Sequence, residues 1–287
     1  MAGASAASEP SWPEMSDAVP QNPLPQSPAK WEDLKVRVIS SAAMLAVGAV
    51  GVILGGVWFQ MLAVFVTAIM VWELWMMIAS DKPNQGAVLA AGVASVQSGL
   101  LMMSSGWALL LFLLVPALGA WRVKHERLTF FLFAVTIQVA GWGLVQFREE
   151  IGFTWIIWLM LVVVATDVFG YLAGRTFGGP KFWPKVSPKK TWSGTAAGWI
   201  AAGVVGFIFM LFTDATWLII PISMITSLAS QMGDIAESAL KRRMGVKDSS
   251  HLIPGHGGLF DRFDALLGAS LFMLLVAYVF DVPGVAF

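Results

Sequence analysis

The chain has 287 residues, of which 57% are hydrophobic and only 13% carry a charge, and its mean hydropathy is +0.73. Soluble domains carry a charge on roughly a quarter of their residues, and a globule of this size exposes too much surface to hide so many apolar side chains. The composition therefore predicts an integral membrane protein. The 18 basic and 18 acidic residues balance, which argues against a nucleic-acid partner, and the absence of cysteine excludes disulfides and thiolate chemistry.

Residues 1–29 are rich in Pro, Ala and Ser and show no apolar periodicity. Such a composition cannot bury enough apolar surface to offset the entropy of ordering, so we expect a disordered tail. The tail lacks the basic segment and apolar run of a cleavable signal peptide, so we expect it to remain in the mature chain.

After Arg37, apolar stretches close to the ~20 residues that cross a bilayer as a helix follow one another with short breaks. They predict an all-α, polytopic fold of about nine transmembrane helices. We expect residues 30–150 to serve packing and dimerisation, and residues 151–287 to form a catalytic region with two basic loops. The expected spans are 38–55, 57–79, 86–103, 106–121, 128–147, 151–173, 194–212, 215–233 and 259–281.

The basic residues support this order of spans. If the N-terminus is cytoplasmic, every Lys and Arg except Arg148 falls at a cytoplasmic end or loop, as the positive-inside rule requires. The third and fourth spans are the shortest, and Ser104 and Ser105 between them could instead lie within one bent element.

Acidic residues inside or at the ends of apolar spans are costly unless they face protein, water or a metal ion. Each one is therefore a candidate functional residue. We assign no role to Glu73, because pairing with a basic residue explains it equally well. The six residues of this kind are Glu73, Asp167, Asp234, Glu237, Asp261 and Asp264.

The segment from Lys181 to Thr195 combines four lysines with hydroxyl side chains and ends where a new helix is expected to begin. Ammonium groups, hydroxyls and the N–H groups of a helix N-terminus all favour a bound phosphate. A basic loop that only contacts anionic lipid head groups is the alternative. Asp167 and Arg175 lie on one helix face two turns apart, where they could simply pair.

A second candidate region runs from Gln231 to Asp264. Gln231, Asp234, Ser238 and Lys241 share one face of a helix that we expect to end at Gly245. The glycines from Gly255 to Gly258 then predict a tight loop whose backbone can approach a ligand, with His256 as a donor to an anion. Asp261 and Asp264 follow at the start of the last helix, and with Asp234 they are the hard oxygen ligands that suit Mg²⁺.

Three motifs in this half of the chain resemble the phosphatidate cytidylyltransferase family, also called CDP-diacylglycerol synthases. The main one runs from Ser238 through Lys241, Arg242, Lys247 and Asp248 to Leu252-x-Pro254-x-His256-Gly257-Gly258-x-x-Asp261-Arg262-x-Asp264. The others are Asp167-x-x-Gly170-Tyr171-x-x-Gly174-Arg175 and Ser187-Pro188-Lys189-Lys190-Thr191-Trp192. Ser193 departs from the pattern, since relatives commonly carry an acidic residue there.

The resemblance implies an inner-membrane enzyme, active site facing the cytoplasm, that makes CDP-diacylglycerol and pyrophosphate from CTP and phosphatidic acid. It also implies a homodimer and Mg²⁺ on Asp234 and Asp261, with Asp264 nearby and K⁺ accompanying the magnesium. The expected phosphate-binding residues are Lys241, Arg242, Lys247 and Arg262, with Ser238 beside them. The opposite wall is expected to contain Ser187, Lys189, Lys190 and Thr191, positioned by Asp167 and Arg175, and His256, Gly257 and Gly258 are expected to line the substrate.

Two other classes of function stay open at this point. Several intramembrane carboxylates would suit a proton- or cation-coupled transporter, although they cluster at the predicted cytoplasmic ends of spans and not at the midplane. A related transferase acting on another nucleotide or alcohol would carry the same phosphate-binding groups. Preference for cytidine rests on the resemblance alone.

Overall fold

The protein is described by a computed structural model that covers residues 30–103 and 106–279. The expected disordered tail over residues 1–29 and the Ser104–Ser105 break lie outside these residues. Within them the chain is almost entirely helical, which confirms an all-α membrane protein. The helices and strands are α1 (Lys30–Leu54), α2 (Gly56–Ile78), α3 (Pro83–Leu101), the 3-10 helix η1 (Gly106–Leu113), α4 (Leu114–Arg122), α5 (Arg127–Gln146), the π-helix η2 (Phe147–Ile151), α6 (Phe153–Phe177), β1 (Lys181–Trp183), β2 (Ser187–Thr191), α7 (Trp192–Phe212), α8 (Ile219–Met244) and α9 (Phe260–Val279).

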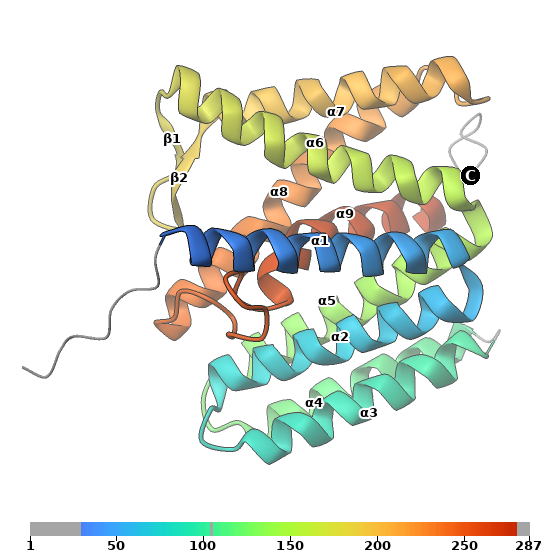
Figure 1. Cartoon of the computed structure of the whole chain (residues 1–287). Helices are drawn as coiled ribbons and strands as arrows, with labels where there is room; N and C mark the ends of the chain where they lie inside the picture. Colours follow the sequence, from blue (N-terminus) through green and yellow to red (C-terminus); the bar gives the residue numbers. More distant parts are fainter. Residues whose placement is uncertain (1–29, 104–105, 280–287) are drawn as a thin grey trace, which may run out of the picture.

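Six helices in the described part of the chain are long and apolar enough to cross a bilayer. They are α1, α2, α5 with η2, α6, α7 and α8, whereas α3 and α9 are not among them and residues 108–122 form only a shorter apolar helix. The third and fourth expected spans are separate helices, and α3 and α4 lie side by side (Figure 1). A count of nine spans remains a prediction.

The helices form two packed groups joined by α9. Helices α6, α7 and α8 lie together on one side, and α2 to α5 lie on the other, with α9 between them and α1 crossing the front (Figure 1). Buried apolar residues form one core around Trp158 and Met273 and a second around Trp75 and Phe130. Because lipid is as apolar as these side chains, the two cores stabilise the fold mainly through close packing between the helices.

Helices α8 and α9 pack with their backbones in close contact. A Cβ atom at Gly233 would lie 2.2 Å from the carbonyl oxygen of Asp264, and one at Gly268 would lie 2.1 Å from that of Ala229. Small residues allow such contact between membrane helices. The close approach sets Asp234 of α8 beside Asp264 of α9.

The basic connections gather at one end of the molecule, on the left of Figure 1. There Arg243, at the end of α8, pairs with Glu126 before α5, with 2.9 Å between Nε and Oε1. Hydrogen bonds from Thr129 and Arg243 hold the pKa of Glu126 below its ordinary value. The hairpin β1–β2 also lies at this end, and it is the one departure from an all-helical expectation in the described residues.

The opposite end carries Arg148, the one basic residue expected on the other side of the membrane. Its Nε donates to the carbonyl oxygen of Val52 at 3.1 Å, and Oε1 of Glu149 accepts from the N–H of Gly56 at 2.9 Å. These two contacts cap the turn between α1 and α2. Arg148 therefore lies at the turn between α1 and α2, and its side of the membrane stays a prediction.

The contact between α8 and α9 can be tested at Gly268. We expect Gly268→Ala to lower the unfolding temperature in detergent by several degrees, because overpacking a core typically costs about 1–3 kcal/mol. Gly99→Ala is the matched control, since a Cβ there meets nothing within 4 Å. Equal unfolding temperatures for the two variants would contradict the close packing.

Candidate active site

Two adjoining cavities open at the end of the molecule where α6, α8, α9 and the hairpin meet. They share Asp167 and Asp234. The first has a volume of about 330 Å³ and contains most of the predicted catalytic carboxylates. Its lining residues are Asp167, Asp234, Glu237, Lys241, Asp248, Asp261, Arg262 and Asp264.

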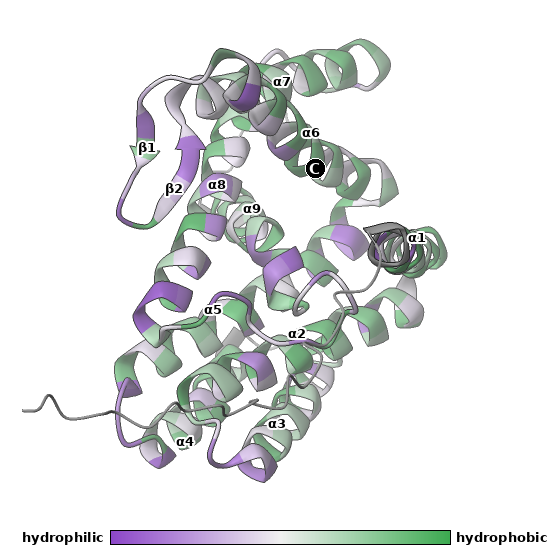
Figure 2. Cartoon of the chain, turned by 60° about the vertical axis from the view of Figure 1, so that its left-hand side comes forward, coloured by the Kyte–Doolittle hydropathy of each residue, from purple (hydrophilic) through white to green (hydrophobic). Residues whose placement is uncertain are grey.

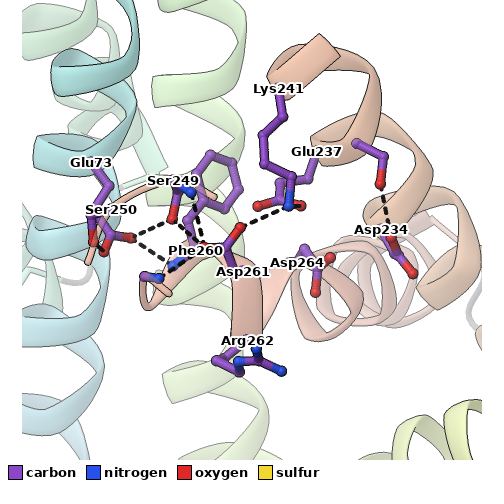
Figure 3. Close-up of polar contacts among 12 residues, drawn as sticks. Glu73, Asp234, Glu237, Lys241, Ser249, Ser250, Phe260, Asp261, Arg262 and Asp264 are labelled. Carbon is purple, nitrogen blue, oxygen red and sulfur yellow. Dashed lines mark hydrogen bonds and ion pairs between the residues drawn. The ribbon is translucent and has the colours of Figure 1, made fainter. Parts of the chain in front are cut away.

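Lys241 lies at the centre of this acidic cavity. Its Nζ is 2.7 Å from Oδ1 of Asp261 and 2.5 Å from Oε2 of Glu237, one turn earlier on α8 (Figure 3). Glu237 is only 1% exposed, and its Oε1 has no hydrogen-bond partner in the described part of the chain. A buried carboxylate oxygen without a donor is costly, so Glu237 has the capacity to accept from a ligand.

Asp261 accepts hydrogen bonds from the loop that precedes α9, which runs from Val246 to Leu259. Its Oδ2 accepts from the backbone N–H of Ser249 at 2.9 Å, from the N–H of Gly258 at 2.8 Å and from the Ser249 hydroxyl at 3.0 Å. With Lys241 on Oδ1, both carboxylate oxygens are engaged (Figure 3). Asp261 therefore fixes the shape of the loop from Val246 to Leu259, in addition to lining the cavity.

Glu73 is the residue that sequence analysis left without a role. It is fully buried on α2 and accepts from the backbone N–H groups of Leu259 and Phe260, at 2.9 and 2.7 Å, and from the Ser250 hydroxyl at 2.6 Å. The first N–H groups of a helix lack partners within it, and a carboxylate is favourable at that end. Glu73 thus caps α9 from another helix.

A signal for this contact is present in the sequence. The residues before α9 are Gly257, Gly258 and Leu259, none of which has a side chain that can cap a helix, so an acceptor from elsewhere is required. Gly258 packs directly against Glu73, since a Cβ there would lie 2.4 Å from Oε1 of Glu73. The glycine at this position is needed for packing, whatever its part in substrate binding.

The second cavity has a volume of about 340 Å³ and a mixed basic and hydroxyl lining. Lys190 of β2 pairs with Asp234 at 2.5 Å between Nζ and Oδ2, and Ser238 donates to Asp234 Oδ1 at 3.2 Å. Arg175 donates to the hydroxyl of Tyr171, and no Asp167–Arg175 ion pair is formed among the described residues. The lining residues are Thr166, Asp167, Gly170, Tyr171, Gly174, Arg175, Lys189, Lys190, Thr191, Gly194, Thr195, Gln231 and Asp234.

The end of the hairpin has the helix start that the sequence predicts. Thr191 Oγ1 accepts from the N–H of Gly194 at 3.3 Å and so caps α7. Ser193, the position where the sequence departs from the expected motif, donates to the carbonyl oxygen of Gly178 and lies 3.0 Å from Thr191 Oγ1. In this chain Ser193 therefore joins the first turn of α7 to the end of α6.

The predicted site residues divide into two sets. Ten line one of the two cavities: Asp167, Arg175, Lys189, Lys190, Thr191, Asp234, Lys241, Asp261, Arg262 and Asp264. The other seven do not line either cavity, although Ser238 contacts Asp234 and Gly257 and Gly258 belong to the adjoining loop: Ser187, Ser238, Arg242, Lys247, His256, Gly257 and Gly258. Nine further residues line the cavities. Glu237 and Asp248 line the acidic cavity, and the second cavity adds Thr166, Gly170, Tyr171, Gly174, Gly194, Thr195 and Gln231.

The donor set bears on whether a metal ion could be held here. Six carboxylates but only two cations line the acidic cavity, and the free Oε1 of Glu237 belongs to it. Across the described residues, however, no three acidic, His or Cys side chains lie close enough together to hold a metal unaided. The donors therefore fit a cation that is shared with substrate phosphates, as Mg²⁺ commonly is, and not a closed protein cage.

Comparison with known proteins identifies relatives over most of the chain. Residues 35–280 match the cytidylyltransferase family. A phosphatidate cytidylyltransferase of Brucella suis is 31% identical over 266 residues, which cover 89% of this chain and 98% of the relative. One from Brucella abortus is 31% identical over 261 residues, covering 88% and 96%. One from Staphylococcus saprophyticus is 42% identical over 139 residues, covering 46% of this chain and 53% of that protein.

The role of Glu73 can be tested by Glu73→Gln. The amide cannot accept from Leu259, Phe260 and Ser250 as the carboxylate does, and its NH₂ would face a donor. We expect a loss of about 1–3 kcal/mol in stability and lower activity from the misplaced loop. Glu150→Gln, at an exposed position on η2, is the control and should change neither. Unchanged unfolding of Glu73→Gln would show that α9 does not depend on this cap.

Proposed function

Because the chain belongs to the cytidylyltransferase family, we propose that it is a phosphatidate cytidylyltransferase, which makes CDP-diacylglycerol and pyrophosphate from CTP and phosphatidic acid. The support is the family match together with the similarity to enzymes of that name along nearly their whole length. The observation that carries the proposal is the pair of adjoining cavities, one cationic and one acidic, that share Asp167 and Asp234.

The reaction forms one bond and breaks one. A phosphate oxygen of phosphatidic acid attacks the α-phosphorus of CTP in line, and the bond to the bridging oxygen of the β-phosphate breaks, so that pyrophosphate leaves. The attacking phosphate is already largely ionised at pH 7, because its second pKa is near 6 by analogy with other phosphate monoesters. No general base is required, and the protein chiefly positions the two phosphates and balances their charge.

The cations of the site have distinct positions for this task. The second cavity, where the CTP phosphates would bind, is lined by Arg175, Lys189 and Lys190. Arg262 is exposed on the α9 side, where the lipid phosphate would bind. Arg242 and Lys247 are exposed beyond the two cavities and would act on the approaching triphosphate through the longer-range field.

Asp234, Asp261 and Asp264, with Glu237 beside them, are the residues that would hold Mg²⁺, with K⁺ as a second cation. A divalent cation bound there supplies charge neutralisation to the CTP phosphates and to the departing pyrophosphate. Lys190 on Asp234 and Lys241 on Glu237 and Asp261 already place positive charge against these carboxylates. When phosphates bind, the carboxylates of the acidic cavity could therefore exchange these lysines for a metal ion, or share them with the phosphates.

The proposal includes an orientation in the membrane. The site, the hairpin and the basic connections lie at the same end, which the positive-inside rule assigns to the cytoplasm of a bacterial inner membrane. The N-terminus would then be cytoplasmic and the chain would cross the membrane nine times. A homodimer formed through residues 30–150 is also part of the proposal.

Turnover by the detergent-solubilised protein tests the proposed reaction. We expect CTP, phosphatidic acid and Mg²⁺ to give CDP-diacylglycerol and pyrophosphate. The formation of the lipid product is measured by chromatography. Lys190→Ala should raise the KM for CTP by about tenfold to a hundredfold, because a hydrogen bond to a charged group contributes about 1.5–3 kcal/mol. Lys185→Ala, outside both cavities, is the matched control.

Absence of CDP-diacylglycerol from the wild-type reaction with every divalent metal tested would refute the activity. An equal KM for CTP in Lys190→Ala and Lys185→Ala would instead leave the activity standing and refute the assignment of the hairpin cavity to the triphosphate.

A further inference from the structure

Helix α1 is held mainly at its two ends. Figure 2 shows it at the edge of the molecule. Ile39 and Leu45 are 68% and 73% exposed, as expected for a helix that faces lipid along most of its length. At its far end, Arg148 contacts the Val52 carbonyl oxygen. The middle part of α1 therefore faces lipid on one side and lines a cavity on the other.

The site end of α1 is fastened to the loop before α9 by His256. The ring lies between two serines of α1, with Nδ1 2.9 Å from Oγ of Ser40 and Nε2 2.9 Å from Oγ of Ser41. Ser40 Oγ also lies 3.0 Å from the carbonyl oxygen of Pro254. The carbonyl oxygen of His256 accepts from Arg262 at 2.6 Å. His256 thus connects α1 to Arg262, whose guanidinium lines the acidic cavity.

Behind α1 lies an apolar cavity of about 300 Å³, enclosed by α1, α2, α5, α6 and α9. Of its lining residues, Ser270 alone has a polar side chain, and its hydroxyl donates to the Ala140 carbonyl oxygen. Along α1 the lining runs from Ala43 to Val52, which is about 14 Å of helix. Ligand pockets begin at about this volume, and the long, apolar shape suits a hydrocarbon chain.

The cavity has an opening toward the lipid and an end near the site. Val47 of α1 and Phe65 of α2 line it and are 57% and 58% exposed, so the space between these helices is open sideways. Leu259, Phe263 and Leu266 also line the cavity, and Phe263 directly follows Arg262 in the first turns of α9. A chain in the cavity would therefore end close to an exposed guanidinium that lines the acidic cavity.

A second apolar groove, between α5, α8 and α9, is less suited to an anionic lipid. It is larger, at about 540 Å³, but its polar end is formed by Glu237 and Asp264, and no Lys or Arg lines it. Two carboxylates would repel a phosphate head group, whereas Arg262 would attract one. Charge complementarity favours the cavity behind α1.

We propose that the cavity behind α1 binds one acyl chain of the phosphatidic acid substrate, with the lipid phosphate at Arg262, and that the contact of His256 with Ser40 and Ser41 fixes α1 as its wall. This inference rests on the proposed function. It accounts for the apolar cavity, the serine pair and the histidine, none of which the transfer reaction itself requires.

Gly48 offers a direct test. It lies on the cavity side of α1, and a Cβ there meets nothing within 4 Å, so Gly48→Phe should fill the cavity without displacing the backbone. We expect the KM for dioleoyl phosphatidic acid to rise at least about tenfold, since the phenyl ring would occupy the space of the acyl chain, and overpacking an apolar site costs about 1–3 kcal/mol. The KM for dihexanoyl phosphatidic acid and for CTP should not change. Ala49→Phe, on the exposed face of α1, is the matched control.

Equal effects of Gly48→Phe on the long-chain and short-chain lipids, or no effect on either, would overturn the proposal. Photolabelling of the wild type covers the case in which the variant does not fold. Phosphatidic acid with a diazirine in the middle of one acyl chain should label peptides of α1 and α9 around Met44 and Leu266. Labelling confined to α8 between Ile225 and Met232 would place the chain in the other groove and refute the assignment. If the wild type turns over neither lipid, the proposed function itself fails.

Discussion

The shape of the site depends on two carboxylates that need hydrogen-bond donors inside the protein. Glu73 of α2 meets that need by accepting from the first N–H groups of α9, and Asp261 meets it by accepting from the loop that precedes α9. Leaving either group unpaired inside the protein would cost several kcal/mol. The two carboxylates therefore hold the loop in one shape and orient the first turn of α9, on which Arg262 and Asp264 stand. Contacts from α1 and α2 reach the catalytic half, so residues 30–150 do more than pack.

Charge balance explains why the remaining acidic residues are tolerated at this depth. Lys190 pairs with Asp234, and Lys241 lies between Glu237 and Asp261, so each cation faces a carboxylate. The carboxylates still outnumber the cations that line the acidic cavity. An excess of oxygen donors beside a cationic hairpin is suited to phosphates that arrive with a metal ion. Lys241 lies in the last turn of α8 and Asp261 in the first turn of α9, whereas a carrier would need its charged residues near the middle of the membrane.

Much of this architecture was predictable, and the exceptions have physical reasons. Composition indicates a helical membrane protein, and the glycine at position 245 ends α8 in the left-handed conformation as expected. Local spacing puts Asp234 and Lys241 on one face of α8 and Asp261 and Asp264 at the start of α9, and the close packing of the two helices brings the four into one cavity. The cap by Glu73 was not predicted, because it joins residues 186 positions apart and nothing in the local sequence names the partner. His256 was expected to face an anion, but its ring contacts two serines of α1, which only the packing of α1 reveals.

The most direct test of this account is the rate of CDP-diacylglycerol formation by Asp234→Asn as Mg²⁺ is titrated. Asp234 lines both cavities, so removing its charge should lower kcat by about a hundredfold or more and shift the Mg²⁺ dependence to higher concentration, while the unfolding temperature stays close to that of the wild type. Asp214→Asn, in the connection at the opposite end of the molecule, should behave as the wild type. An Asp234→Asn protein with wild-type kcat and unchanged Mg²⁺ dependence would contradict the account.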